Sequence, residues 1–100
     1  MQFAGIYKGT IPAASSPGIN VKLTLNTDYT FELVSEYIDR EGIFINTGRF
    51  KLDGDFITLN PRNGNSSPNY KLGDNQVYHL DIEGNIITGN LADLYILKKE

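Results

Sequence analysis

The chain contains 100 residues, of which 40% are hydrophobic and none is cysteine, and its formal net charge is −3. This length and composition indicate one globular domain with a single core, spanning residues 1–100. The lack of cysteine excludes disulfides, thiolate metal ligands and cysteine nucleophiles, and scattered basic residues in an acidic chain argue against a nucleic-acid partner. The first residues lack the basic and apolar regions of a signal peptide, and no window is long and apolar enough to span a membrane.

Apolar and polar residues alternate along most of the chain, whereas helical periodicity is almost absent. Alternation of this kind predicts β-strands that bury one face. We expect strands over residues 3–8, 21–25, 29–38, 43–52, 55–59, 70–72, 76–82, 86–88 and 94–98, with a single helical turn within residues 89–93.

Turn-forming residues separate these runs. Asp53-Gly54 is the strongest short hairpin signal, and residues 60–69 form a long polar stretch that predicts an exposed loop. Gly48 lies inside an expected strand and therefore predicts a bulge, a sharp bend or a close neighbour.

About eight or nine short strands at roughly ten-residue spacing are typical of a β-sandwich or an up-and-down barrel. Tight turns join neighbouring runs, which favours meander pairing, and closing the sheet removes its exposed edges. We therefore expect an all-β fold, a small antiparallel up-and-down β-barrel of about eight strands. Its interior is expected to be filled by aromatic side chains and not by a ligand, with the phenylalanines Phe31, Phe44, Phe50 and Phe56.

One stretch of small residues stands out, between the first two expected strands. Pro12 and Pro17 each fix φ and lack a backbone donor, and Gly18 is conformationally permissive. This composition predicts a stiff, exposed connection that could contact a ligand or a partner. The candidate loop comprises Pro12, Ala13, Ala14, Ser15, Ser16, Pro17 and Gly18.

The residues that could carry chemistry are few. His79 is the only histidine, and a metal ion needs three or four donors, so we expect it to face outward or simply to be hydrogen-bonded. Ser15 and Ser16 lack a recognisable base and orienting group, so we interpret them as turn formers.

The neighbouring carboxylates fall in turns, where acidic residues are favoured for backbone reasons. These are Asp53 with Asp55, and Asp39 with Glu41. Neither pair matches a glycosidase cleft or a calcium loop, and no catalytic cluster is visible. The sequence therefore predicts a protein that is not an enzyme.

Several motifs in chain order resemble the N-terminal domain of the NlpE family, the copper-resistance or copper-homeostasis lipoproteins of Gram-negative envelopes. They are Tyr7-Lys-Gly-Thr-Ile-Pro12, Pro17-Gly-Ile19, Leu23-Thr-Leu25, Asp28-Tyr-Thr-Phe31, Ser35-Glu-Tyr37, Gly48-Arg-Phe50, Asp53-Gly-Asp-Phe-Ile-Thr-Leu59, Gly84-Asn85 and Leu91-Ala-Asp-Leu-Tyr-Ile-Leu97. The resemblance spans nearly the whole chain and implies a small antiparallel barrel distantly similar to lipocalins.

The chain departs from the family at one place. The family loop between the proline and the Pro-Gly carries a Cys-x-x-Cys pair proposed to bind copper or to be redox-active, and these positions are Ala13 and Ser16 here. Thiolates select Cu(I), alanine offers no donor, and a serine hydroxyl is a poor substitute. Copper is thus implied by the resemblance but not supported by these residues, and no cofactor is expected.

The resemblance implies a non-enzymatic domain of the cell envelope, on the periplasmic side of the outer membrane, that senses stress or binds a partner with its copper site lost or weakened. Membrane contact would come only through a lipid anchor, whose acylated cysteine this sequence lacks. The expected partner is an envelope protein or a small apolar ligand. The alternatives are a lipocalin-like carrier of such a ligand, a structural interaction module and, least favoured, a hydrolase.

Overall fold

Eight β-strands and one short helix make up the computed structural model, which describes residues 3–13, 16–38, 42–62, 69–80, 84–87 and 92–100. For residues 12, 13, 16, 17, 92 and 93 it describes the backbone alone. The strands are β1 (Gly5–Ala13), β2 (Ser16–Leu25), β3 (Thr30–Tyr37), β4 (Ile43–Asp53), β5 (Phe56–Pro61), β6 (Tyr70–Gly73), β7 (Gln76–His79) and β8 (Ile96–Lys99), and the 3₁₀ helix η1 spans Ala92–Tyr95.

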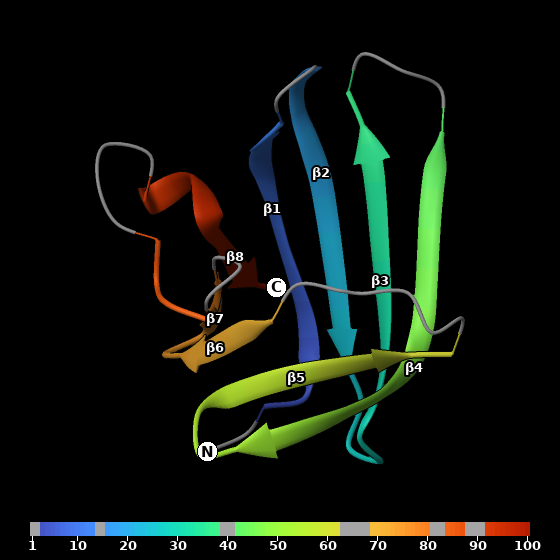
Figure 1. The fold of residues 1–100 in the computed structure, drawn as a ribbon, viewed down its shortest axis with the longest axis vertical. Helices are drawn as coiled ribbons and strands as arrows, with labels where there is room; N and C mark the ends of the chain where they lie inside the picture. Colours follow the sequence, from blue (N-terminus) through green and yellow to red (C-terminus); the bar gives the residue numbers. More distant parts are fainter. Residues whose placement is uncertain (1–2, 14–15, 39–41, 63–68, 81–83, 88–91) are drawn as a thin grey trace.

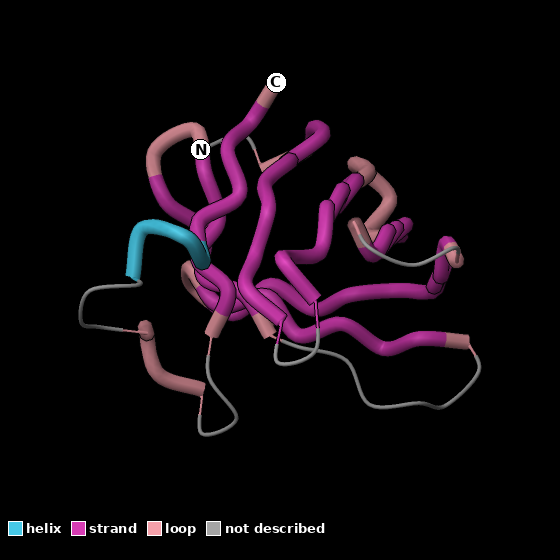
Figure 2. The backbone as a smooth tube through the Cα atoms, turned by 90° about the horizontal axis from the view of Figure 1, so that it is seen from above, coloured by secondary structure: helices cyan, strands magenta, loops and turns pink. Residues whose placement is uncertain are grey.

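The strands pair in chain order, each antiparallel to the next, and β8 pairs with β1 to close the barrel. The long strands β1 to β4 stand side by side, β5 crosses below them, and the short strands β6 to β8 complete the other wall (Figure 1). Figure 2 shows η1 at one side of the molecule, directly before β8. The prediction of an all-β, up-and-down antiparallel barrel is confirmed.

The expected element bounds differ from the observed ones mainly near the C-terminal end. Residues 86–88 were expected to form a strand, but among the described residues there is only an isolated bridge between Leu80 and Ile86. The helical turn expected within residues 89–93 is η1, which starts later and takes up the beginning of the strand expected at 94–98. No helix in the described part of the chain is long and apolar enough to cross a membrane.

The ladder that joins the first strand to the last and closes the barrel is short. The ladder joins Tyr7 to Lys99 and Lys8 to Lys98, and the Glu100 amide donates to the Ile6 carbonyl at 2.9 Å. Lys8 also forms an ion pair with Glu100, and the side chains of both residues are about half exposed. An exposed ion pair adds little stability, so the main chain accounts for most of this seam.

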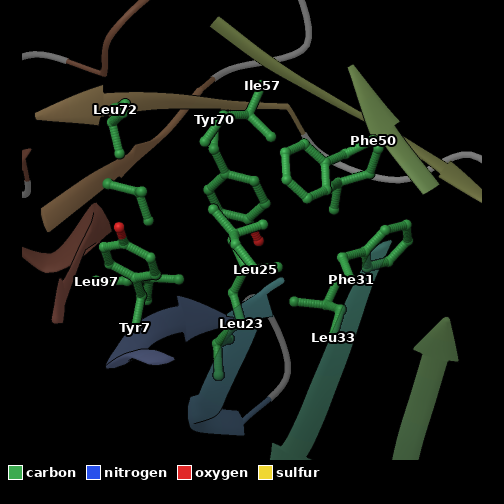
Figure 3. Packing of buried hydrophobic residues seen from close by; sticks show 13 residues of the cluster. Tyr7, Leu23, Leu25, Phe31, Leu33, Phe50, Ile57, Tyr70, Leu72 and Leu97 are labelled. Atoms are coloured by element: carbon green, nitrogen blue, oxygen red, sulfur yellow. The ribbon is translucent and has the colours of Figure 1, made fainter. Parts of the chain in front are cut away.

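Among the residues that the structure describes, fourteen buried apolar side chains form the core, and two of the largest are tyrosines. Tyr7 and Tyr70 are almost fully buried, and their rings lie in the middle of the cluster (Figure 3). The Tyr7 hydroxyl donates to the Phe3 carbonyl at 2.6 Å, which satisfies its polar end. Burial raises the pKa of both phenols, so both stay neutral at physiological pH.

Two of the four phenylalanines expected inside the barrel are in fact exposed. Phe31 and Phe50 are buried, but Phe44 is 59% exposed and Phe56 is 48% exposed. Phe56 lies on the outer face because β5 turns Ile57 and Leu59 inward. Phe44 lies in the part of β4 that pairs with β3 alone, so no strand covers its ring from the opposite wall.

Gly48 is the first β4 residue that pairs with β5 and still pairs with β3. A Cβ atom placed here would overlap the carbonyl oxygen of Asn60 and would lie 3.0 Å from the Cα of Pro61. Among the three alternatives for Gly48, the close neighbour is therefore confirmed. Figure 1 shows that β4 changes direction in its middle to meet β5.

We expect Gly48→Ala to lower the free energy of unfolding by about 1–3 kcal/mol, because the added methyl group meets backbone atoms that cannot move away like a flexible side chain. Urea unfolding monitored by circular dichroism measures the change. Lys51→Thr, an exposed change on the same strand, should stay within about 0.5 kcal/mol of the native chain and serves as the control. Equal stability of the two variants would contradict the role assigned to Gly48.

Candidate functional site

The candidate loop lies where β1 and β2 join, and most of it is not a loop. The β1–β2 ladder continues through Gly9↔Val21, Thr10↔Asn20 and Ile11↔Ile19. The expected strands 3–8 and 21–25 therefore end too early and begin too late, because the residues on either side of the candidate loop are paired strand. Alternation of side chains in a paired ladder outweighs the turn preference of the prolines and glycines here.

The two prolines and Gly18 are accommodated in different ways. The register shifts between Ile11 and Ala13, so Pro12 sits at an irregularity, which is where strands tolerate a residue without an N–H group. Gly18 is buried, and a Cβ there would lie 2.9 Å from Thr10 Cγ2 and 3.3 Å from Ile38 Cδ1. Its φ is not positive, so glycine is favoured at position 18 because a side chain would be crowded there, and not because of the unusual backbone conformation expected from the sequence.

Beyond the irregularity, Ala13 pairs with Ser16 across the two strands. Ala14 and Ser15, also part of the candidate loop, lie outside the described residues. The register thus brings together the two positions at which the family resemblance places cysteines. Directly opposed residues of an antiparallel pair have Cβ atoms about 4.5–5.5 Å apart, close enough for two suitable side chains to bind one ion.

The residues at these positions do not fit copper. Alanine has no donor atom, and a neutral hydroxyl is a hard, weak ligand for Cu(I). Within the described residues, no group of three or more histidine, cysteine, aspartate or glutamate side chains could hold a metal ion. The hairpin end therefore places two backbone positions together without the chemistry of a metal site.

His79 lies at the end of β7 and faces the interior side of the sheet, like Val77 two residues earlier, so the outward orientation expected for it is wrong. Its ring centroid is 5.3 Å from that of Tyr70, in an edge-on arrangement, and 5.9 Å from that of Tyr95. Nδ1 is buried and makes no hydrogen bond to another described residue. Burial lowers the pKa of His79, which favours the neutral imidazole.

The carboxylates expected in turns are only partly described. Asp53 ends β4 and Asp55 lies in the hairpin turn after it, both exposed, with Gly54 between them at a φ of +61°. That φ is what the first position of a two-residue hairpin turn requires. Asp39 and Glu41 lie outside the described residues.

Comparisons with known proteins identify a matching family and similar crystal structures. The model of the family described as the NlpE N-terminal domain matches residues 7–90. The crystal structure of a candidate lipoprotein from Shewanella oneidensis is similar at a TM-score of 0.87 and 45% identity, over 100% of this chain and 91% of that one. The crystal structure of the Cpx pathway activator NlpE from Escherichia coli has a TM-score of 0.74 at 24% identity, over 88% of this chain but only 47% of that one. A search of curated proteins found no match.

The closed, eight-stranded antiparallel meander is a small β-barrel domain, and its fold matches that of the candidate lipoprotein over the whole chain. The chain belongs to the NlpE N-terminal domain family. The resemblance based on the sequence motifs is therefore confirmed.

Since the unfolded chain has a histidine pKa of about 6.5 and the folded chain a lower one, the unfolded state takes up the proton first as the pH falls. We expect the stability contributed by neutral His79 to be complete above about pH 6.5 and to decline as the pH falls towards the native pKa. Urea unfolding at pH 7.5 and 5.5 measures this decline. His79→Gln cannot titrate and should show a smaller decline; an identical pH dependence would contradict the burial effect.

Proposed function

We propose that this chain is a non-enzymatic binding or stress-sensing domain of a lipoprotein of the bacterial cell envelope, held on the periplasmic side of the outer membrane, that acts by protein contact and not through copper. Family membership supports the class, and the Shewanella oneidensis relative, described as a candidate lipoprotein, supports the envelope location. The Escherichia coli relative is described as a Cpx pathway activator, which supports a role in signalling.

The single observation that carries the loss of copper binding is the pairing of Ala13 with Ser16. The backbone keeps the two positions opposed, so the arrangement that two cysteines would need is retained while both thiolates are missing. With metal binding removed, contact with another protein is the role that this proposal leaves to the candidate loop.

The packing of the interior supports a binding module over a carrier of a small apolar ligand. The rings of Tyr7 and Tyr70 occupy the middle of the barrel together with aliphatic side chains from both walls (Figure 3). A carrier instead needs an interior cavity large enough for its ligand. Among the described residues, one hollow of about 460 Å³ lies over β1 to β4, and another of about 490 Å³ is lined by Tyr29 and by residues of β4 and β5.

Restoring the two thiols tests the copper proposal. We expect Ala13→Cys/Ser16→Cys to compete with a chromophoric Cu(I) chelator under anaerobic conditions, because the register brings both sulfur atoms to one ion, whereas the native chain should not compete. The single variants Ala13→Cys and Ser16→Cys are the controls and should bind far more weakly. Strong competition by the native chain would overturn the proposal.

Adding charge at the same positions tests the contact surface. We expect Ala13→Asp/Ser16→Asp to reduce capture of an envelope partner in a cross-linking pull-down at least tenfold, because two unpaired carboxylates would be desolvated in the contact. The change Thr58→Asp, on the exposed face of β5, is the control. Unchanged capture by the doubly charged variant would contradict the contact role of the loop, and it would not affect the result of the copper competition.

A further inference from the structure

Among the described residues, the first half of β4 has a strand neighbour on one side only. It pairs with β3 from Ile43 to Arg49, but with β5 only from Gly48 to Asp53. The amide of Arg62 donates to the Thr47 carbonyl at 2.8 Å, which ends the paired stretch on the β5 side. No described residue pairs with the outer edge of residues 43–45, and Figure 1 shows β4 as the outermost of the long strands.

The direction of the backbone groups along this edge follows from the Thr47 contact. The Thr47 carbonyl points away from β3, and backbone groups of an antiparallel strand alternate in direction from one residue to the next. Ile43 and Ile45 therefore direct their N–H and C=O groups outward, while Phe44 directs its own towards β3. Two donors and two acceptors are thus presented for pairing.

The side chains along the same edge are apolar and exposed. Ile43, Phe44 and Ile45 are 58%, 59% and 60% exposed, and as consecutive strand residues they cover both faces. Natural sheets protect an open edge with charged residues, prolines or bulges, and these three residues carry none of them. An open, apolar strand edge is a site for pairing with another strand.

We propose that this edge pairs with the same edge of a second copy of the chain, antiparallel and about a two-fold axis at Phe44. The sequence Ile43-Phe44-Ile45 reads the same in both directions, so that each isoleucine meets an isoleucine of the partner and the two phenylalanines meet at the axis. A self-complementary surface is what a two-fold interface requires. A different partner strand would give no reason for this symmetry.

The backbone agrees with that register. Ile43 lies opposite the partner's Ile45, and both residues direct their N–H and C=O groups into the interface, which gives two hydrogen-bonded pairs and four hydrogen bonds. Phe44 lies opposite the partner's Phe44 as a pair without hydrogen bonds, in which Cα atoms approach to about 4.5 Å. None of the three side chains is charged, so no like charges oppose each other.

The interface is short, because Arg62 already occupies the edge at Thr47. A contact of this size falls below the roughly 1,200 Å² of a stable interface, so the dimer is weak and depends on concentration. This inference is independent of the proposed function, since it rests on β4 and not on the β1–β2 hairpin end.

A cysteine scan tests the register, since the native chain has no cysteine. We expect Phe44→Cys to form a disulfide-linked dimer under mild oxidation, because a Cα separation of about 4.5 Å lies within disulfide range. The matched control, Ile43→Cys, stays monomeric, because the shifted register separates its two Cα atoms by about 8 Å. Equal cross-linking of both variants, or none by Phe44→Cys, overturns the proposal.

Sedimentation of chains that keep Phe44 provides the second measurement. The native chain is expected to dimerise as its concentration rises, and Ile45→Lys is expected to weaken the dimer at least tenfold by charging the edge. Ile86→Lys, at another exposed isoleucine, should behave like the native chain. A native chain that remains monomeric up to about 1 mM, or a dimer that Ile45→Lys leaves unchanged, contradicts the proposal.

Discussion

The close approach of Gly48 to the backbone of Asn60 and Pro61 is the contact on which the rest of the barrel depends. At this point β4 is shared between β3 and β5, and an added side chain would overlap the β5 backbone. Because β4 turns towards β5 here, its second half closes the barrel over the core. Its first half continues along β3 alone, which leaves the outer edge of residues 43–45 open.

The turn between β2 and β3 shows a second constraint, close to the Gly48 contact, because the Phe50 amide donates to the Tyr29 carbonyl at 2.9 Å. Tyr29 has a φ of +66°, an unfavourable conformation for a bulky side chain, and its ring stacks on Phe3 with a centroid distance of 5.2 Å. The Asp28 carboxylate accepts hydrogen bonds from the amide and hydroxyl of Thr30, which lowers the pKa of Asp28. Ring stacking and this capped turn together stabilise the strained residue.

Much of the fold could be predicted from the sequence because strand alternation and two-residue turns are local signals. The hairpin at Gly54 and the close approach at Gly48 follow from the preference of glycine for positive φ and for tight contacts. No local sequence pattern of this kind predicts that the ring of Tyr70 is buried. Which aromatic side chain fills a barrel depends on the path of the strands, and this also explains why Phe44 and Phe56 are exposed.

The candidate site was predictable in position but not in structure. Pro12, Pro17 and Gly18 looked like the ends of a loop, yet the ladder up to Ile11 and Ile19 continues the sheet, since long-range pairing outweighs local preference. The pairing of Ala13 with Ser16 could be inferred only once the register was known. The inward orientation of His79 likewise could not be predicted from its own strand, because its neighbours, the rings of Tyr70 and Tyr95, come from other elements.

The hairpin end and the open β4 edge lie at the same end of the barrel, opposite the end at which β1 begins (Figure 1). They are linked through β2 and the residue after β3, because the Ile38 amide donates to the Gly18 carbonyl at 3.2 Å and the Ile38 side chain packs beside Gly18. The hairpin end and the first half of β4 are therefore joined through the paired main chains of β2 and β3, although each proposal rests on its own residues.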